Sequence, residues 1–111
     1  MRQEGSKTER RATHFSPQKS SILNMSEKVQ EISCGVIHTL VLTSMNRILS
    51  CGYGGSFALG HGSQESLNQF KEIHSLRTLG KIKTIAAGMN HSGCVTSDGK
   101  VYMWGISGDA N

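Results

Sequence analysis

The residues with the clearest potential for chemistry are two cysteine–histidine pairs. Three residues separate Cys34 from His38, and two residues separate His91 from Cys94. Two thiolates and two imidazoles form a ligand set that binds structural zinc in tetrahedral geometry. A zinc site is therefore one hypothesis for these four side chains, and it competes with a structural role for each of them.

An internal repeat favours the structural role. Residues 29–58 align without a gap on residues 82–111, with 7 identities in 30 pairs. His38 falls on His91, whereas the two cysteines fall on small apolar residues of the other copy. A repeated fold reuses the same packing residues in every unit, while a metal site is needed only once. We therefore expect each histidine to bridge backbone groups within its own unit, the cysteines to be free and buried, and no metal or other cofactor to be bound.

Other patterns of catalysis are also missing from the sequence. The glycine-rich stretch between Gly52 and Gly62 does not end in the Gly-Lys-Ser/Thr that a phosphate-binding loop requires. The eight acidic residues are scattered, and no Ser/His/Asp arrangement stands out. We therefore predict that the chain is not an enzyme.

The elements that position these residues are short β-rich runs separated by glycine. Asp98-Gly99 between two of the runs is a strong signal for a two-residue hairpin turn. Four antiparallel strands in a period of roughly 40–50 residues are typical of a β-propeller blade. The expected strands are Val29–Cys34, Ile37–Thr43, Arg47–Cys51 and Gln69–His74 in the first copy, and Ile82–Ala87, His91–Thr96 and Lys100–Trp104 in the second.

Both copies carry Gly-x-x-His followed by a hydroxyl residue, and the second copy ends its third run in Trp104-Gly105. The first copy continues into Leu59-Gly60-His61-Gly62. This pattern resembles the repeat of the regulator of chromosome condensation family, whose members are seven-bladed β-propellers. The resemblance covers residues 29–111, and it implies a structural role for Gly35, His38, Gly52, Gly60, Gly88, His91, Trp104 and Gly105.

The first copy departs from the family pattern at three places. Cys51 stands where the family has Trp, Met45-Asn46 stands for Asp-Gly, and Phe57-Ala58 stands for Gly-Gln. We therefore expect an all-β fold of about two incomplete blades of four antiparallel strands. Its expected divisions are a disordered basic tail over 1–28, a first, degenerate propeller repeat over 29–81, and a second, truncated repeat over 82–111.

The charge and composition limit the cell compartments and the kinds of partner that the chain can have. Residues 1–28 carry six of the 12 Lys and Arg and three of the eight acids, so most of the net charge of +4 lies outside the repeats. No segment has the roughly 18 apolar residues that a membrane span needs. Three cysteines without a secretion signal indicate free thiols in a reducing compartment. Ser16-Pro17 resembles a proline-directed phosphorylation site, so Ser16 is a candidate for modification.

The resemblance implies that the chain binds other proteins as a scaffold. Because the second copy stops within the motif, we expect a truncated isoform or fragment of a propeller. The alternative is a guanine-nucleotide exchange factor for a small GTPase, as part of a complete propeller. The expected partners are proteins, either a small GTPase or other chains that complete the propeller, and not a membrane, nucleic acid or chromatin. The expected location is intracellular, either cytoplasmic or nuclear.

Overall fold

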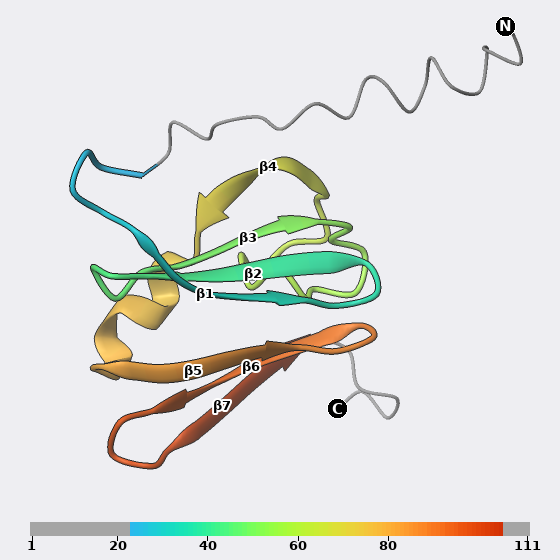
Figure 1. Ribbon diagram of the computed structural model, residues 1–111. Coiled ribbons are helices and arrows are strands. Elements are labelled where there is room, and N and C mark those ends of the chain that lie inside the picture. Colours follow the sequence, from blue (N-terminus) through green and yellow to red (C-terminus); the bar gives the residue numbers. More distant parts are fainter. Residues whose placement is uncertain (1–22, 106–111) are drawn as a thin grey trace, which may run out of the picture.

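The computed structural model describes residues 23–105, which form two antiparallel β-sheets (Figure 1). The expected Ser16 site lies outside the described residues. No helix in residues 23–105 is long and apolar enough to cross a membrane. The elements are β1 (Val29–Cys34), β2 (His38–Thr43), β3 (Ile48–Gly52), β4 (Leu67–Glu72), the 3₁₀ helix η1 (His74–Leu79), β5 (Ile82–Ala87), β6 (His91–Thr96) and β7 (Val101–Gly105).

Each sheet is a meander, with order β1-β2-β3-β4 in the first and β5-β6-β7 in the second. The expected all-β fold with propeller blades is therefore confirmed. The β2–β3 and β6–β7 turns are equivalent, and each needs a residue with positive φ. Gly99 supplies it in the second sheet at 92°, and Asn46 supplies it in the first at 62°. Asn adopts this left-handed conformation more readily than most residues, so Met45-Asn46 can stand for Asp-Gly in this turn.

The hydrophobic core lies between the two sheets. Alternate residues of a strand point to one face, and in β2 this places Leu40 and Leu42 toward the second sheet. Each is no more than 1% exposed. Leu76 and Leu79 of η1 pack against the edge of this core. The other buried members are Ile48, Ile73, Ile82, Ile85 and Cys94, with Tyr102 and Trp104 packed against them.

Polar contacts join the two sheets along their first strands. The Thr84 hydroxyl donates to Glu31 Oε2 at 2.9 Å, and the Ala87 amide donates to Ser33 Oγ at 2.9 Å. Asn46 joins the sheets at the far turn, because its side chain donates to the Gly80 carbonyl and accepts from the Ile82 amide. A polar side chain in a turn therefore helps to set the position of the second sheet.

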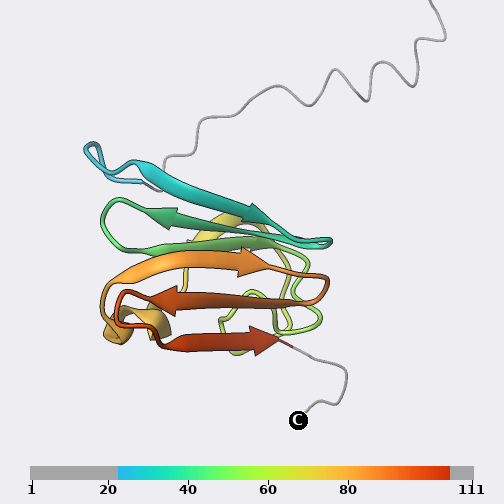
Figure 2. The same cartoon turned by 60° about the horizontal axis from the view of Figure 1, so that its bottom comes forward.

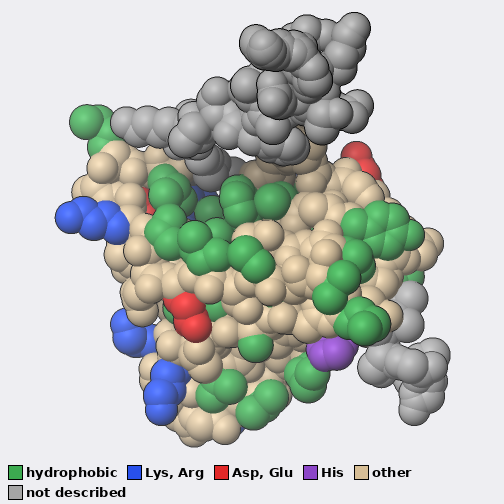
Figure 3. All heavy atoms as spheres, turned by 45° about the vertical axis from the view of Figure 1, so that its right-hand side comes forward, with side chains coloured by type: hydrophobic (Ala, Val, Ile, Leu, Met, Phe, Trp, Pro, Cys, Tyr) green, Lys and Arg blue, Asp and Glu red, His purple; other side chains and the backbone are tan. Residues whose placement is uncertain are grey.

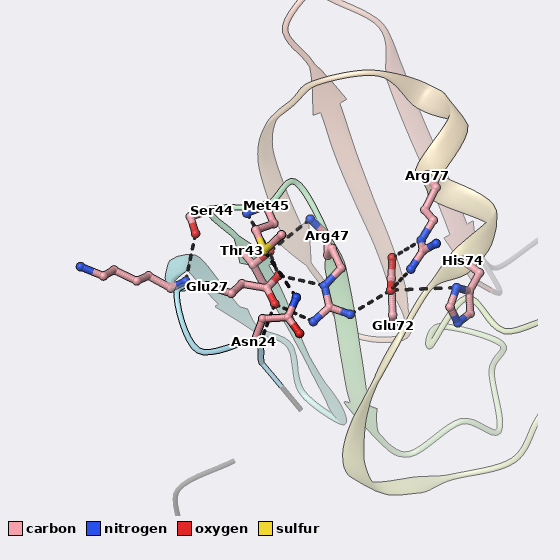
Figure 4. Close-up of polar contacts among 10 residues, drawn as sticks. Asn24, Glu27, Thr43, Ser44, Met45, Arg47, Glu72, His74 and Arg77 are labelled. Atoms are coloured by element: carbon pink, nitrogen blue, oxygen red, sulfur yellow. Dashed lines mark hydrogen bonds and ion pairs between the residues drawn. The ribbon is translucent and has the colours of Figure 1, made fainter. Parts of the chain in front are cut away.

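A buried charge network links the start of the described chain to the first sheet (Figure 4). Arg47 lies between Glu27 and Glu72, with N–O distances of 2.7 and 2.9 Å. Arg77 of η1 reaches Glu72 at 2.6 Å. Glu27 also accepts from the Thr43 hydroxyl at 2.5 Å. The tail was expected over residues 1–28, but residues 23–28 are described and Glu27 is 5% exposed. Glu27, which lies within that range, packs against the first sheet through Thr43 and Arg47.

This network should make the fold sensitive to acid. Hydrogen bonds from Arg47 and Arg77 lower the pKa of Glu27 and Glu72, respectively, from 4.5 to about 2. A carboxylate with a lowered folded-state pKa contributes stability above its unfolded pKa and loses it as pH falls through the folded value. We expect the urea midpoint to drop between about pH 4.5 and 2.

Glu27→Gln tests this expectation, because the amide keeps the shape and removes the titration. Its urea midpoint should be lower than wild type at pH 7, and the two should converge toward pH 2. If the urea midpoint of the variant falls with pH as steeply as that of wild type, Glu27 does not carry the acid dependence.

Candidate functional site

Three loops lie at the same end of the two sheets (Figure 1), and the surface that they form is here called the loop surface. It comprises residues 35–37 between β1 and β2, 53–66 between β3 and β4, and 88–90 between β5 and β6. The Val36 amide donates to the Gly88 carbonyl at 3.2 Å, and the Tyr53 amide donates to the Ile37 carbonyl at 2.9 Å. Backbone hydrogen bonds therefore join the three loops across both sheets.

The loop surface exposes large apolar side chains and almost no charge. Val36 is 72% exposed, Met89 66%, Tyr53 55% and Phe57 40%. The three loops contain one acidic residue, Glu65, and no Lys or Arg. Figure 3 shows hydrophobic side chains on this side of the molecule. Contiguous exposed apolar surface of this kind indicates a site for binding another protein.

The opposite end of the sheets has a different character. Lys28, Lys81 and Lys100 lie beside the turns at that end, and Lys100 is 3.9 Å from Asp98. Figure 3 shows Lys and Arg side chains along the edge away from the loop surface. The two ends therefore offer different chemistry, one neutral and apolar and the other basic.

Phe57 is held in a backbone conformation that a bulky residue seldom adopts. Its φ is 65°, in the left-handed region. The hydrogen bond from the Phe57 amide to the Gly54 carbonyl at 3.0 Å closes this turn. Residues held in such strained conformations often lie at functional sites. The strained backbone of Phe57 thus carries an aromatic ring that is partly exposed on the loop surface.

The long loop that carries Phe57 is anchored at its base. The Ser50 hydroxyl donates to the Leu59 carbonyl at 2.7 Å, and the Trp104 indole donates to the Ala58 carbonyl at 2.9 Å. Gly60 has φ 83°, and a Cβ there would lie 2.9 Å from Trp104 Nε1. Gly60 therefore leaves room for the Trp104 indole, and through Trp104 the second sheet holds the loop that follows β3.

His38 is a buried link between the sheets. Its Nε2 lies 2.7 Å from Ser92 Oγ, and the Ser92 hydroxyl donates to the Ala58 carbonyl at 2.7 Å. With the Ser92 hydroxyl donating to Ala58, the contact with Ser92 Oγ assigns the proton of the neutral His38 ring to Nε2. Nδ1 is then a bare acceptor, and it is buried without a partner among the described residues. Burial lowers the pKa of His38 below its usual 6.5.

The histidine contact differs from the expectation that each histidine bridges its own unit. His38 binds a side chain of the next sheet. The equivalent ring of His91 has no hydrogen bond to any described residue, and its neighbour is Gly88, where a Cβ would lie 2.7 Å from Nε2. A sequence pattern shows that a residue recurs, but it does not show which neighbouring unit it contacts.

The repeated glycines allow close backbone approach. A Cβ at Gly35 would lie 2.3 Å from the Gly88 carbonyl oxygen of the second sheet. Gly52 and Gly105 end the third strands with φ of 118° and 108°, beside the backbone of the histidine that begins the adjacent strand. These contacts explain why glycine recurs in both copies.

The side chains considered for zinc do not gather. Within residues 23–105 there is no group of three or more His, Cys, Asp or Glu arranged to hold a metal ion. All three cysteines are free. Cys94 is buried as expected, but Cys34 is exposed, so the expectation of burial was wrong for Cys34. It lies on β1, which is an edge strand of the first sheet. Burial raises the pKa of the Cys94 thiol, which is therefore neutral and unreactive at pH 7.

One serine–histidine contact is also structural. Ser50 Oγ lies 3.1 Å from His61 Nε2, but Ser50 is fully buried and already donates to a carbonyl. It has neither the access nor the free proton that a nucleophile needs. Burial lowers the pKa of His61, so the ring is neutral at pH 7.

Comparison with known proteins identifies the repeat. Residues 82–109 match the family model of the regulator of chromosome condensation (RCC1) repeat. The chain belongs to the regulator of chromosome condensation repeat family. The match begins at β5 and includes Gly88, His91, Trp104 and Gly105, which the structure places at the contacts described above.

Longer similarity extends over both repeats. The X-linked retinitis pigmentosa GTPase regulator of Homo sapiens is 39% identical over 79 residues, 71% of this chain. The regulator of chromosome condensation of Drosophila melanogaster is 37% identical over 81 residues, 73% of this chain. Yeast RCC1 (Prp20), in a structure bound to Kap60, has a TM-score of 0.65 and 26% identity over 79% of this chain. The chain spans 8%, 15% and 22% of these proteins, respectively.

Phe57 is also a departure from the pattern of the repeat family. The resemblance implies glycine at the position of Phe57, and glycine adopts positive φ at no steric cost. This chain retains the left-handed backbone and adds an aromatic side chain to it. From the sequence alone, this replacement indicates a degenerate repeat. The sequence signal that could have identified Phe57 as a functional residue is a bulky side chain at a position that requires positive φ.

Proposed function

We propose that this chain is a protein-interaction element of the regulator of chromosome condensation repeat type, with its loop surface as the binding site. The observation that carries the proposal is the joined, uncharged set of loops with four large apolar side chains exposed. Aromatic side chains and Met are enriched at protein interfaces, and charged residues are depleted at their centres. Tyr53 and Phe57 are the expected anchors.

The structural role of the repeat residues supports binding rather than catalysis. His38, Gly35 and Trp104 hold the two sheets and the long loop together, so the loop surface is presented on a rigid base. A pre-organised surface binds more tightly, because less conformational entropy is lost on association. We propose that the chain acts by this route inside the cell, in the cytoplasm or nucleus, where its three free thiols stay reduced.

Phe57→Gly tests the anchor and the strain in one variant. Removing the ring should weaken binding of a protein partner at least about tenfold, as truncation of an aromatic hot-spot residue does. The same change relieves a left-handed bulky residue, so the free energy of unfolding should stay constant or rise by up to about 1 kcal/mol. Affinity is measured by surface binding of partners captured by the wild-type chain, and stability by urea unfolding.

Met25→Ser is the matched control, because Met25 is fully exposed near the opposite end. It should leave partner binding unchanged. If Phe57→Gly and Tyr53→Ser bind as wild type does, the loop surface is not the site. If no protein binds the wild-type chain in any condition, the proposed function itself is wrong.

The alternative is nucleotide exchange on a small GTPase. Two relatives carry the names GTPase regulator and regulator of chromosome condensation, which makes a small GTPase the first partner to try. We expect binding without exchange, because the loop surface of the described residues presents the loops of two sheets only. The measurement is release of a fluorescent guanine nucleotide with and without the chain. A clear catalytic gain in release rate would favour the alternative.

A further inference from the structure

The second sheet has an open face on the side away from the first sheet (Figure 2). A hollow of about 250 Å³ lies on it, over β5, β6 and β7. Its lining includes Gly93, Val101 and Met103, and the last two are 64% and 66% exposed. No Lys, Arg, Asp or Glu lines the hollow. This open face is the broad side of the second sheet, whereas the loop surface lies at the end of that sheet.

The contact between the two sheets is a template for this face. In the first sheet, the side chains of His38, Leu40 and Ile48 point toward the second sheet. At an offset of 53 residues, the second sheet carries His91, Gly93 and Val101 at the same places. The open face therefore repeats the face that the first sheet uses to hold its neighbour.

The first sheet also presents the features by which the second sheet is held. Ser92 is the partner of His38, and its counterpart in the first sheet is Thr39, another hydroxyl that is partly exposed. Ile85 is a member of the core, and its counterpart is Ile32, which is 57% exposed. We propose that β1 and β2 of a second copy of this chain dock on the open face of β5–β7.

The polar groups support this occupant. In the docked pair, Thr39 of the second copy faces the His91 ring as Ser92 faces His38. The Met89 amide faces the Gly35 carbonyl of the second copy, as the Val36 amide faces Gly88 at 3.2 Å. Thr84 and Glu31 meet again, since each stands at the position of the other. Buried polar groups need such partners.

Side-chain sizes also differ between the observed contact and the proposed one. Gly93 stands for Leu40 and leaves the hollow in the open face. On the docking partner, Cys34 stands for Ala87, which packs against the core in the observed contact, so a larger side chain enters the space. Cys34 and Ile32 are both exposed in the single chain and become covered. The docking of a second copy thus covers apolar side chains on both surfaces.

Such a contact joins two different surfaces, so it is heterologous and leaves one surface of each kind open. The test is sedimentation velocity of the 111-residue chain over a range of concentrations. The wild-type mass should rise with concentration above the 12.0 kDa of one chain. Met103→Glu blocks the open face and Ile32→Glu blocks the docking strand, and each variant alone should stay monomeric.

An equimolar mixture of Met103→Glu and Ile32→Glu should form a dimer, because each variant retains the surface that the other lacks. Met45→Glu places the same charge on a residue 52% exposed at the far turn, and it should associate as wild type does. Far-UV circular dichroism checks that all variants fold. A wild-type chain that is monomeric at every concentration would overturn the proposal, as would a mixture that stays monomeric.

Discussion

Gly35→Ala is expected to separate the two sheets. A Cβ at Gly35 would stand 2.3 Å from the carbonyl oxygen of Gly88, and that oxygen belongs to the backbone of a turn. Neither partner is a flexible side chain, so the sheets must move apart to relieve the clash. The same carbonyl accepts a hydrogen bond from Val36 at 3.2 Å, which the movement would break. We expect a loss of about 3 kcal/mol in the free energy of unfolding, as for severe overpacking.

Trp104 makes this loss measurable, since it is the only tryptophan in the chain and packs against the core between the sheets. Urea unfolding followed by its fluorescence should show a lower midpoint in Gly35→Ala. Amide exchange at Ile85 and Ala87 should quicken, because both amides donate to side chains of the first sheet.

Gly99→Asn is the matched control for Gly35→Ala. Nothing lies within 4 Å of a Cβ at Gly99, and the equivalent turn already has Asn46 with positive φ. It should cost less than about 1 kcal/mol. Equal losses in the two variants would mean that glycine content, and not the approach of the sheets, sets the stability.

His38→Ala is expected to have an effect of similar size for a different reason. The variant removes a buried ring that is 3% exposed, together with its 2.7 Å contact to Ser92. Cavity formation and the lost hydrogen bond together should lower the free energy of unfolding by about 2–4 kcal/mol. The measurement is again urea unfolding, at pH 7.5 and at a concentration where the chain is monomeric.

His91→Ala is the matched control, because the ring of His91 has no hydrogen bond to another described residue. Its loss should be well below that of His38→Ala. If the two variants lose equally, the bridge from His38 to Ser92 adds nothing to stability, and the histidines act only by packing within their own sheets.

The pH dependence provides a second check on His38. Burial lowers its pKa below 6.5, so the folded state holds the ring neutral where the unfolded chain takes up a proton. Stability should therefore fall as pH drops below about 6.5, and this part of the slope should vanish in His38→Ala. This window lies above the one set by Glu27 and Glu72, so the two effects can be separated.

The loop surface could be foreseen only in part. Gly52–Gly62 reads as a loop from its glycines, and the replacement of glycine by Phe57 is visible in the sequence. The meeting of Val36, Tyr53 and Met89 with this loop was not visible, because they lie on separate turns. Only the packing of one sheet on another places those turns side by side.

The sequence by itself determined the strands, their antiparallel order and the family of the repeat. Alternating apolar residues and turn glycines are local signals, and a period of 53 residues shows that one unit recurs. The tertiary structure decided how the units meet. It directed His38 to Ser92 of the neighbouring sheet, made Asn46 a link between sheets, and drew Glu27 into a charge network with Arg47 and Glu72. Each of these contacts joins residues distant in the chain, and their partners depend on the distance and angle between whole sheets, which no local pattern encodes.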